Sequence, residues 1–150
     1  MQKMNDKEIK KELPLIGWRE WISLPDLNIA SIKAKIDTGA HTSALHAKNI
    51  KYEKSEGKTY IIFKTYPLQK SLKNPVRVKA LLVGKKKIKS SNGQSETRPV
   101  IKTKITLGEF SWLIHITLTK RDQMGFRFIL GREALKDRFF VDTGRSFIID

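Results

Sequence analysis

The segment 33-KAKIDTGAHTSALHA-47 joins an alternating strand pattern to a turn followed by small residues. In 29-IASIKAKI-36 every second residue towards the end is apolar, which is typical of a strand with one face on the core. The strand pattern stops at Asp37, and Gly39 allows a tight turn directly after it. A turn at the end of a strand presents a carboxylate to a cleft instead of burying it in the sheet. Asp37 is therefore the first candidate functional residue.

The same alternation of apolar and polar residues recurs along most of the chain. Apolar alternation predicts strands over 74–83, 99–107 and 110–118, and residues 58–66 are rich in the aromatic and β-branched types that strands favour. The one helix that the pattern predicts is short, 132-REALKDR-138, where good helix formers follow a glycine. The chain is predicted to be all-β with one short C-terminal helix.

The length of 150 residues is that of one domain. Residues 1–14 are expected to form a charged N-terminal tail, and residues 15–150 a single domain. No apolar run approaches the roughly 20 residues of a membrane span, and the opening residues lack the apolar middle of a secretory signal. A cytoplasmic protein without membrane association is expected.

The composition is strongly basic, with 30 Lys and Arg against 15 Asp and Glu and a formal net charge of +15. The electric field of such a positive charge attracts polyanions, including RNA, DNA and acidic peptide segments. The basic residues are spread among the predicted strands, without the aromatic-rich signature of an RNA-binding domain. A solvated basic surface therefore explains the charge as well as a binding function does.

The residue types present limit the reactions that the chain could catalyse. The chain has no cysteine, so it offers neither a thiolate nucleophile nor a thiolate metal ligand. His41, His46 and His115 form no HExxH pair, and neither a GxSxG motif nor a glycine-rich phosphate loop is present. We expect no metal and no cofactor, and carboxylates remain as the candidate catalytic groups.

The triplet Asp-Thr-Gly occurs a second time at 142–144, in a different setting. Asp142 follows two phenylalanines and a valine and precedes Arg145, which favours a hairpin turn between 139-FFV-141 and 146-SFII-149. A two-lobed enzyme needs a complete lobe around each triplet, and one domain has no room for two. Asp142 is not expected to be catalytic.

Two motifs in order resemble a known family. The string 34-AKIDTGA-40 resembles the active-site turn of aspartic proteases of the retroviral type, and 128-FILGREAL-135 resembles their second hallmark, Gly-Arg followed by a short helix. Between them, 104-KITLGEFSWLIHITL-118 resembles the hairpin that separates the flap from Gly-Arg. Most of the chain resembles one bacterial retropepsin-like family, usually labelled ATP-dependent zinc proteases, in the segments IGWREW (16–21), AKIDTGAHTSALHA (34–47), RPV (98–100), LTKRDQM (118–124) and ILGREAL (129–135). No zinc-ligand set and no nucleotide loop in the sequence supports that label.

The resemblance implies a retropepsin-like acid-protease barrel with a flap hairpin. The polar stretch near Asn92 and Gly93 falls where the flap should lie, so these two residues and Ala40 are the expected substrate contacts. Gly131 and Arg132 are expected to be structural.

The resemblance also implies a homodimer, in which Asp37 and its mate from a second chain form the catalytic pair while Thr38 and Gly39 fix the turn. In many retroviral enzymes an acidic residue four positions after the catalytic aspartate pairs with the arginine of Gly-Arg. His41 occupies that position here, so Arg132 needs another anion. The candidates are Glu133, Asp142 and a group from the partner subunit.

The family resemblance and the basic composition lead to two candidate functions. The first is a homodimeric aspartic endopeptidase that cuts a peptide or protein substrate held under the flap. The alternative is a non-catalytic basic binding module of the same fold, which engages ribosomal or nucleic-acid-associated partners. Members of the family are associated with ribosomal-protein modification by a glutamate ligase, which makes that machinery an expected partner by resemblance.

Overall fold

The structure is a computed structural model that describes residues 12–68, 73–89, 92–120 and 125–149. Most of the expected N-terminal tail, residues 1–11, lies outside the described residues, as do Ser90 and Ser91 of the expected flap. Strands dominate the described chain, and α2 (Arg132–Leu135) and the single-turn 3-10 helix η1 (Pro25–Leu27) are short. The all-β prediction is confirmed.

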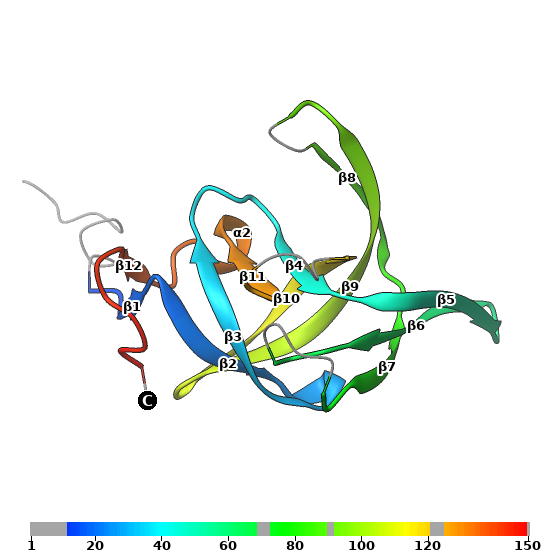
Figure 1. The fold of residues 1–150 in the computed structure, drawn as a ribbon, viewed down its shortest axis with the longest axis horizontal. Coiled ribbons are helices and arrows are strands. Elements are labelled where there is room, and N and C mark those ends of the chain that lie inside the picture. Colours follow the sequence, from blue (N-terminus) through cyan, green and yellow to red (C-terminus); the bar gives the residue numbers. More distant parts are fainter. Residues whose placement is uncertain (1–11, 69–72, 90–91, 121–124, 150) are drawn as a thin grey trace, which may run out of the picture.

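Six strands close a barrel (Figure 1). Their order around it is β10, β4, β11, β3, β2 and β9, and β9 pairs back with β10. The bounds are β2 (Arg19–Leu24), β3 (Ile29–Asp37), β4 (Ser43–His46), β9 (Ser95–Leu107), β10 (Phe110–Thr119) and β11 (Phe128–Gly131). Because successive side chains of a strand point to opposite faces, one apolar row from each strand fills the interior. Ile32, Ile105 and Ile116 from three of these strands are completely buried.

Three further parts extend from the barrel in Figure 1. Strand β8 (Gly84–Lys89) pairs with the first half of β9, and together they form an arm that rises beyond the barrel. Strands β5 (Lys48–Ser55), β6 (Lys58–Thr65) and β7 (Val76–Leu81) form a separate three-stranded sheet. Strands β1 (Leu15–Gly17) and β12 (Phe140–Asp142) form a parallel pair near the C-terminus.

Some boundaries differ from the sequence-based expectations. Strand β9 begins at Ser95 instead of residue 99, because its first residues pair with β8. The helix expected over 132–138 ends at Leu135, and the backbone of Asp137 is left-handed, with φ of 63°. That turn brings Phe139 back to the core, where its ring meets those of Phe110 and Trp112.

The second Asp-Thr-Gly triplet forms a turn, as predicted, but no strand follows it. The Asp142 carboxylate accepts a hydrogen bond from the Gly144 backbone at 2.9 Å. The segment after it lies along the barrel instead, where the buried Glu20 carboxylate accepts hydrogen bonds from the backbones of Ile148 and Ile149. The predicted hairpin was therefore wrong in its second strand, because a buried carboxylate binds that segment.

Candidate active site

Asp37 is the last residue of β3, and its carboxylate is fixed through one oxygen. Its Oδ1 accepts hydrogen bonds from the backbone N–H groups of Gly39, at 3.1 Å, and Ala40, at 3.2 Å. Among the described residues, no hydrogen-bond donor contacts Oδ2. Asp37 is half-buried, while Thr38 and Gly39 are exposed. One fixed oxygen and one open oxygen, at an accessible turn, is an arrangement that can hold a water molecule.

Gly131 lies beside Asp37 because β11 and β3 are parallel neighbours in this register. A Cβ atom at Gly131 would lie 2.5 Å from the backbone carbon of Thr42 and 2.6 Å from its oxygen. The Gly131 N–H donates to the Ser43 hydroxyl at 3.0 Å in a buried position. The close approach of β11 to the chain that follows the Asp37 turn therefore requires glycine.

Arg132 holds the same turn from the other side. Its backbone N–H donates to the Ala40 carbonyl at 2.7 Å, and its guanidinium donates to the Thr38 carbonyl at 3.1 Å. Arg132 thus binds the carbonyls of Thr38 and Ala40, on either side of Gly39, while Gly131 contacts Thr42 and Ser43 after the turn.

The anion expected for Arg132 is not found in the described part of the chain. Glu133 instead lies 3.4 Å from the Nε2 atom of His41, and Asp142 lies near Arg145 in its own turn. A backbone carbonyl replaces the carboxylate as the acceptor for Arg132, and the carboxylate next to it pairs with His41 instead.

A cleft of about 390 Å³ separates the turn from the arm. From the turn side it is lined by Gly39, Ala40, His41, Thr42, Ala44 and Ile129, and from the arm by Lys86, Lys87, Ile88, Lys89 and Arg98. Ala40 lines the cleft, and its role as a substrate contact stays a prediction. Asn92 and Gly93 lie between β8 and β9 at the end of the arm and do not line the cleft.

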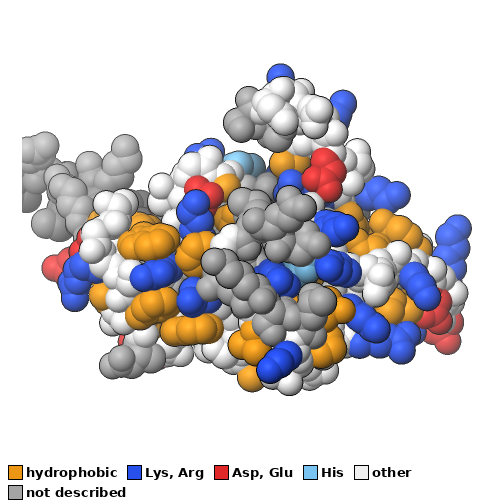
Figure 2. All heavy atoms as spheres, in the orientation of Figure 1, with side chains coloured by type: hydrophobic (Ala, Val, Ile, Leu, Met, Phe, Trp, Pro, Cys, Tyr) orange, Lys and Arg blue, Asp and Glu red, His pale blue; other side chains and the backbone are white. Residues whose placement is uncertain are grey.

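Basic residues dominate the arm side of this cleft. Arg98 is paired with Glu96 at 3.1 Å, and Lys86 lies 3.9 Å from Glu133. Lys87 and Lys89 add positive charge. Figure 2 shows Lys and Arg side chains over much of the visible face, with few acidic ones. The sequence signal for these cleft residues is the run 84-GKKKIK-89, which composition alone does not place beside Asp37.

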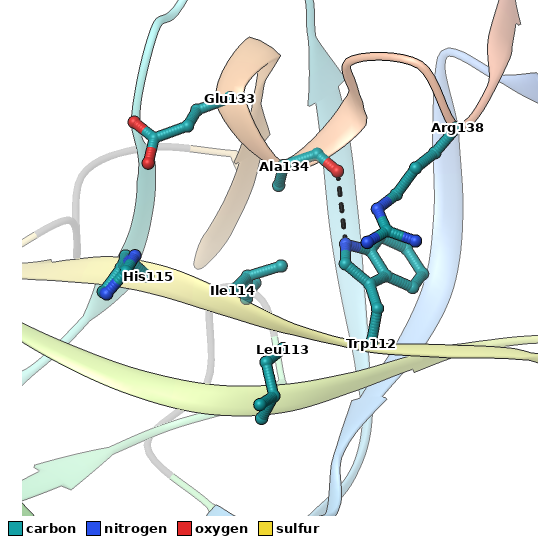
Figure 3. Close-up of a pocket in the computed structure, with 7 residues that line it drawn as sticks. All are labelled: Trp112, Leu113, Ile114, His115, Glu133, Ala134 and Arg138. Carbon is teal, nitrogen blue, oxygen red and sulfur yellow. Dashed lines mark hydrogen bonds between the residues drawn. The ribbon is translucent and has the colours of Figure 1, made fainter.

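Residues of β10, the short helix α2 and Arg138 line a small hollow of about 120 Å³ (Figure 3). The indole N–H of Trp112 donates to the Ala134 carbonyl at 3.2 Å, and the Arg138 guanidinium lies 5.3 Å from the indole ring. These contacts attach α2 to β10, so they support the position of Arg132 at the start of the helix. His115 also lines the hollow.

Across the described ranges, no three His, Cys, Asp or Glu side chains gather where they could hold a metal ion. In the same ranges, no helix is long and apolar enough to cross a membrane.

The profile of a family described as "RimB-like: Retropepsin-like aspartic endopeptidase RimB" matches residues 15–150. The chain belongs to this RimB-like family. The retropepsin-like barrel and the family resemblance expected from the sequence are thereby confirmed.

Relatives of this RimB-like chain include two proteins named probable alpha-L-glutamate ligase. The one from Shewanella pealeana is 44% identical over 135 residues, which cover 90% of this chain and 30% of the relative. The one from Desulfotalea psychrophila is 44% identical over 128 residues, which cover 85% of this chain and 28% of the relative. The chain therefore spans less than a third of the length of these relatives.

A solved structure is also similar. A Legionella pneumophila protein of unknown function shares 30% sequence identity, with a TM-score of 0.75, over 90% of this chain and 97% of that one.

Proposed function

We propose that this RimB-like chain is an aspartic endopeptidase that works as a homodimer, with one Asp37 from each copy. The observation that carries the proposal is the Asp37 carboxylate itself. It stands at a half-buried strand end beside Gly131, with one oxygen fixed by two backbone N–H groups, and the next residues of its turn, Gly39 and Ala40, line a cleft. Membership of a family of aspartic endopeptidases supports the same reading.

Peptide hydrolysis at such a site requires two carboxylates that share one proton, because two like charges so close do not both ionise. The ionised carboxylate takes a proton from water as the water oxygen bonds to the scissile carbonyl carbon. The protonated carboxylate donates its proton to the carbonyl oxygen. On collapse of the tetrahedral intermediate the C–N bond breaks, and the carboxyl that took the water proton gives it to the leaving nitrogen. The other carboxylate takes a proton from a hydroxyl of the intermediate, which restores the shared proton of the pair.

The second carboxylate comes from another copy in this proposal. Asp142, in the other Asp-Thr-Gly triplet, uses Oδ1 to accept the Gly144 N–H, and its strand β12 pairs outside the barrel with β1. The exposed Thr38 borders a groove of about 620 Å³, to which Leu135, Phe139 and Val141 contribute apolar surface. A second copy that covers this groove would bring its own Asp37 turn towards the first one.

The cations of the cleft indicate an acidic peptide as the substrate. Lys86, Lys89 and Arg98 line the space beside the Asp37 turn, and carboxylates of a bound peptide would neutralise them. Proteins that contain a domain similar to this one are named probable alpha-L-glutamate ligases, a name consistent with a substrate that carries glutamates.

Replacement of Lys86 and Lys89 by glutamine is expected to raise KM for a glutamate-rich peptide roughly three- to tenfold, with little change in kcat. Each exposed ion pair contributes about 0.2–1 kcal/mol, and the variant loses two such pairs with the bound peptide. The free protein loses only the long contact of 3.9 Å between Lys86 and Glu133. Steady-state cleavage of matched glutamate-rich and glutamine-rich peptides measures the effect.

The matched control is the pair Lys102→Gln and Lys104→Gln, which removes the same charge from an exposed part of β9 outside the cleft. It should leave KM nearly unchanged. An equal rise in KM in both double variants, or faster cleavage of the glutamine-rich peptide by the unaltered protein, would refute the acidic-substrate assignment.

A further inference from the structure

The sheet of β5, β6 and β7 has one apolar face and one basic face. Ile61, Phe63 and Val78 are buried and belong to the hydrophobic core. Because side chains alternate along a strand, the residues between them point the other way, and Lys64 and Arg77 are exposed there. This second face has no part in the barrel, and it lies on different strands from Asp37, Gly131 and Arg132.

Strand register brings the cations of this face together. Lys64 lies directly opposite Arg77, while Lys51 and Lys79 lie on either side of Ile62. We call Lys51, Lys64, Arg77 and Lys79 the basic face. Like charges directly opposite one another destabilise a sheet, so this arrangement costs free energy when no anion is bound.

Three of the four cations lack a carboxylate partner in the described part of the chain. Lys79 pairs with Glu53 at 3.5 Å. No carboxylate of the described residues lies within 4.0 Å of Lys51, Lys64 or Arg77. Their charges are therefore available to an external anion.

The three unpaired cations also surround one hollow, of about 450 Å³. An irregularity in β5 between Lys48 and Lys51, where Asn49 has a left-handed backbone with φ of 56°, shapes one wall. The hollow is lined by Asn49, Ile50, Lys51, Ile62, Phe63, Lys64 and Arg77. The charges thus converge on one place instead of following a line.

We propose that the basic face binds the phosphodiester backbone of a nucleic acid. The two charged oxygens of each phosphodiester group point out from the nucleic-acid backbone, so the Arg77 fork and the ammonium groups of Lys51 and Lys64 can contact successive phosphates of one strand. Each nucleotide of a strand carries one such negative charge, so a single strand supplies an anion for every unpaired cation of the basic face. The formal charge of +15 on the whole chain adds a long-range attraction for a polyanion.

The side chains of the basic face can contact phosphate groups, but they provide no free aromatic ring on which a base could stack. Tyr60 is the aromatic residue in the neighbouring row, between Glu53 and Leu81, and the Lys79 ammonium already lies over its ring at 5.1 Å. Binding at this face is therefore independent of sequence and steeply dependent on salt. It does not depend on the proposed catalysis.

Fluorescence anisotropy with a labelled single-stranded RNA of mixed sequence, over a series of salt concentrations, tests the inference. The site variant carries Lys51→Gln, Lys64→Gln and Arg77→Gln. The control carries Lys102→Gln, Lys104→Gln and Lys120→Gln, which removes the same charge from exposed positions elsewhere. All six positions are exposed, and thermal melting checks that both variants are folded.

The site variant should lose more than about tenfold in affinity at low salt, and its slope of log affinity against log salt should fall by about 2, since three phosphate contacts are removed at roughly 0.7 each. The control should lose less than about threefold. Equal losses in both variants, no RNA binding by the unaltered protein, or displacement of RNA by an equally charged polyglutamate peptide at the same concentration would each overturn the proposal.

Discussion

An Asp37→Asn variant is expected to fold normally and to lose peptide cleavage, with kcat lower by roughly 10³-fold or more. Asparagine keeps a carbonyl oxygen that can accept the Gly39 and Ala40 N–H groups, so the turn is preserved. It cannot take a proton from water, and general acid–base catalysis typically contributes a factor of about 10²–10⁴. Cleavage of a glutamate-rich peptide, followed together with the thermal melting temperature, measures both parts of this prediction.

The second Asp-Thr-Gly triplet supplies the matched control. Asp142→Asn makes the same chemical change in the same tripeptide, and the amide oxygen of the introduced asparagine can still accept the Gly144 N–H. This variant should retain cleavage. Retained cleavage in the Asp37 variant, or equal loss in both, would contradict the assignment of Asp37. If the unaltered chain cleaves no peptide, the non-catalytic binding module replaces the enzyme.

A Gly131→Ala variant is expected to be destabilised by about 3 kcal/mol, which corresponds to a fall of about 10 °C in melting temperature. The added Cβ atom would lie 2.5 Å from the backbone carbon of Thr42, and no flexible side chain can move aside there. The backbone of β4 or β11 must shift, and the Asp37 turn that depends on it shifts as well, so cleavage should also fall.

Gly84→Ala is the control for this substitution. Nothing lies within 4 Å of a Cβ atom at Gly84, and its backbone is not left-handed, so its stability should change by less than about 0.5 kcal/mol. Urea unfolding of both variants gives the comparison. A Gly131 variant as stable as the Gly84 variant would show that the close approach of β11 to Thr42 is not required.

The sequence predicted those strands in which buried apolar residues alternate regularly with exposed polar ones. Strand β3 was expected over 29–36, because apolar side chains alternate with polar ones there. In the structure it ends at Asp37. Strand β5 was not predicted, since most of its side chains are exposed and its residues show no apolar alternation. The docking of the C-terminal segment was missed because it depends on the buried Glu20, a residue type that patterns assign to the surface.

The sequence predicted the motifs of the candidate site but not the groups that contact them. Sequence context alone singles out Asp37 and Gly39, and the family resemblance adds Gly131. The acceptor for the Arg132 guanidinium is the Thr38 carbonyl, and a backbone group cannot be identified from residue types. The cations of the arm reach the cleft only because β8 and β9 extend beyond the barrel, which is a tertiary property that a run of lysines does not encode.

The central claim is that one active site needs two copies of Asp37, and subunit mixing tests it most directly. Unaltered protein is mixed with the Asp37→Asn variant in varying ratios at constant total concentration, and cleavage is measured after the subunits have exchanged. If two Asp37 carboxylates form one site, activity should follow the square of the unaltered fraction, because mixed dimers are inactive. Activity that falls in simple proportion to the unaltered fraction would contradict the account.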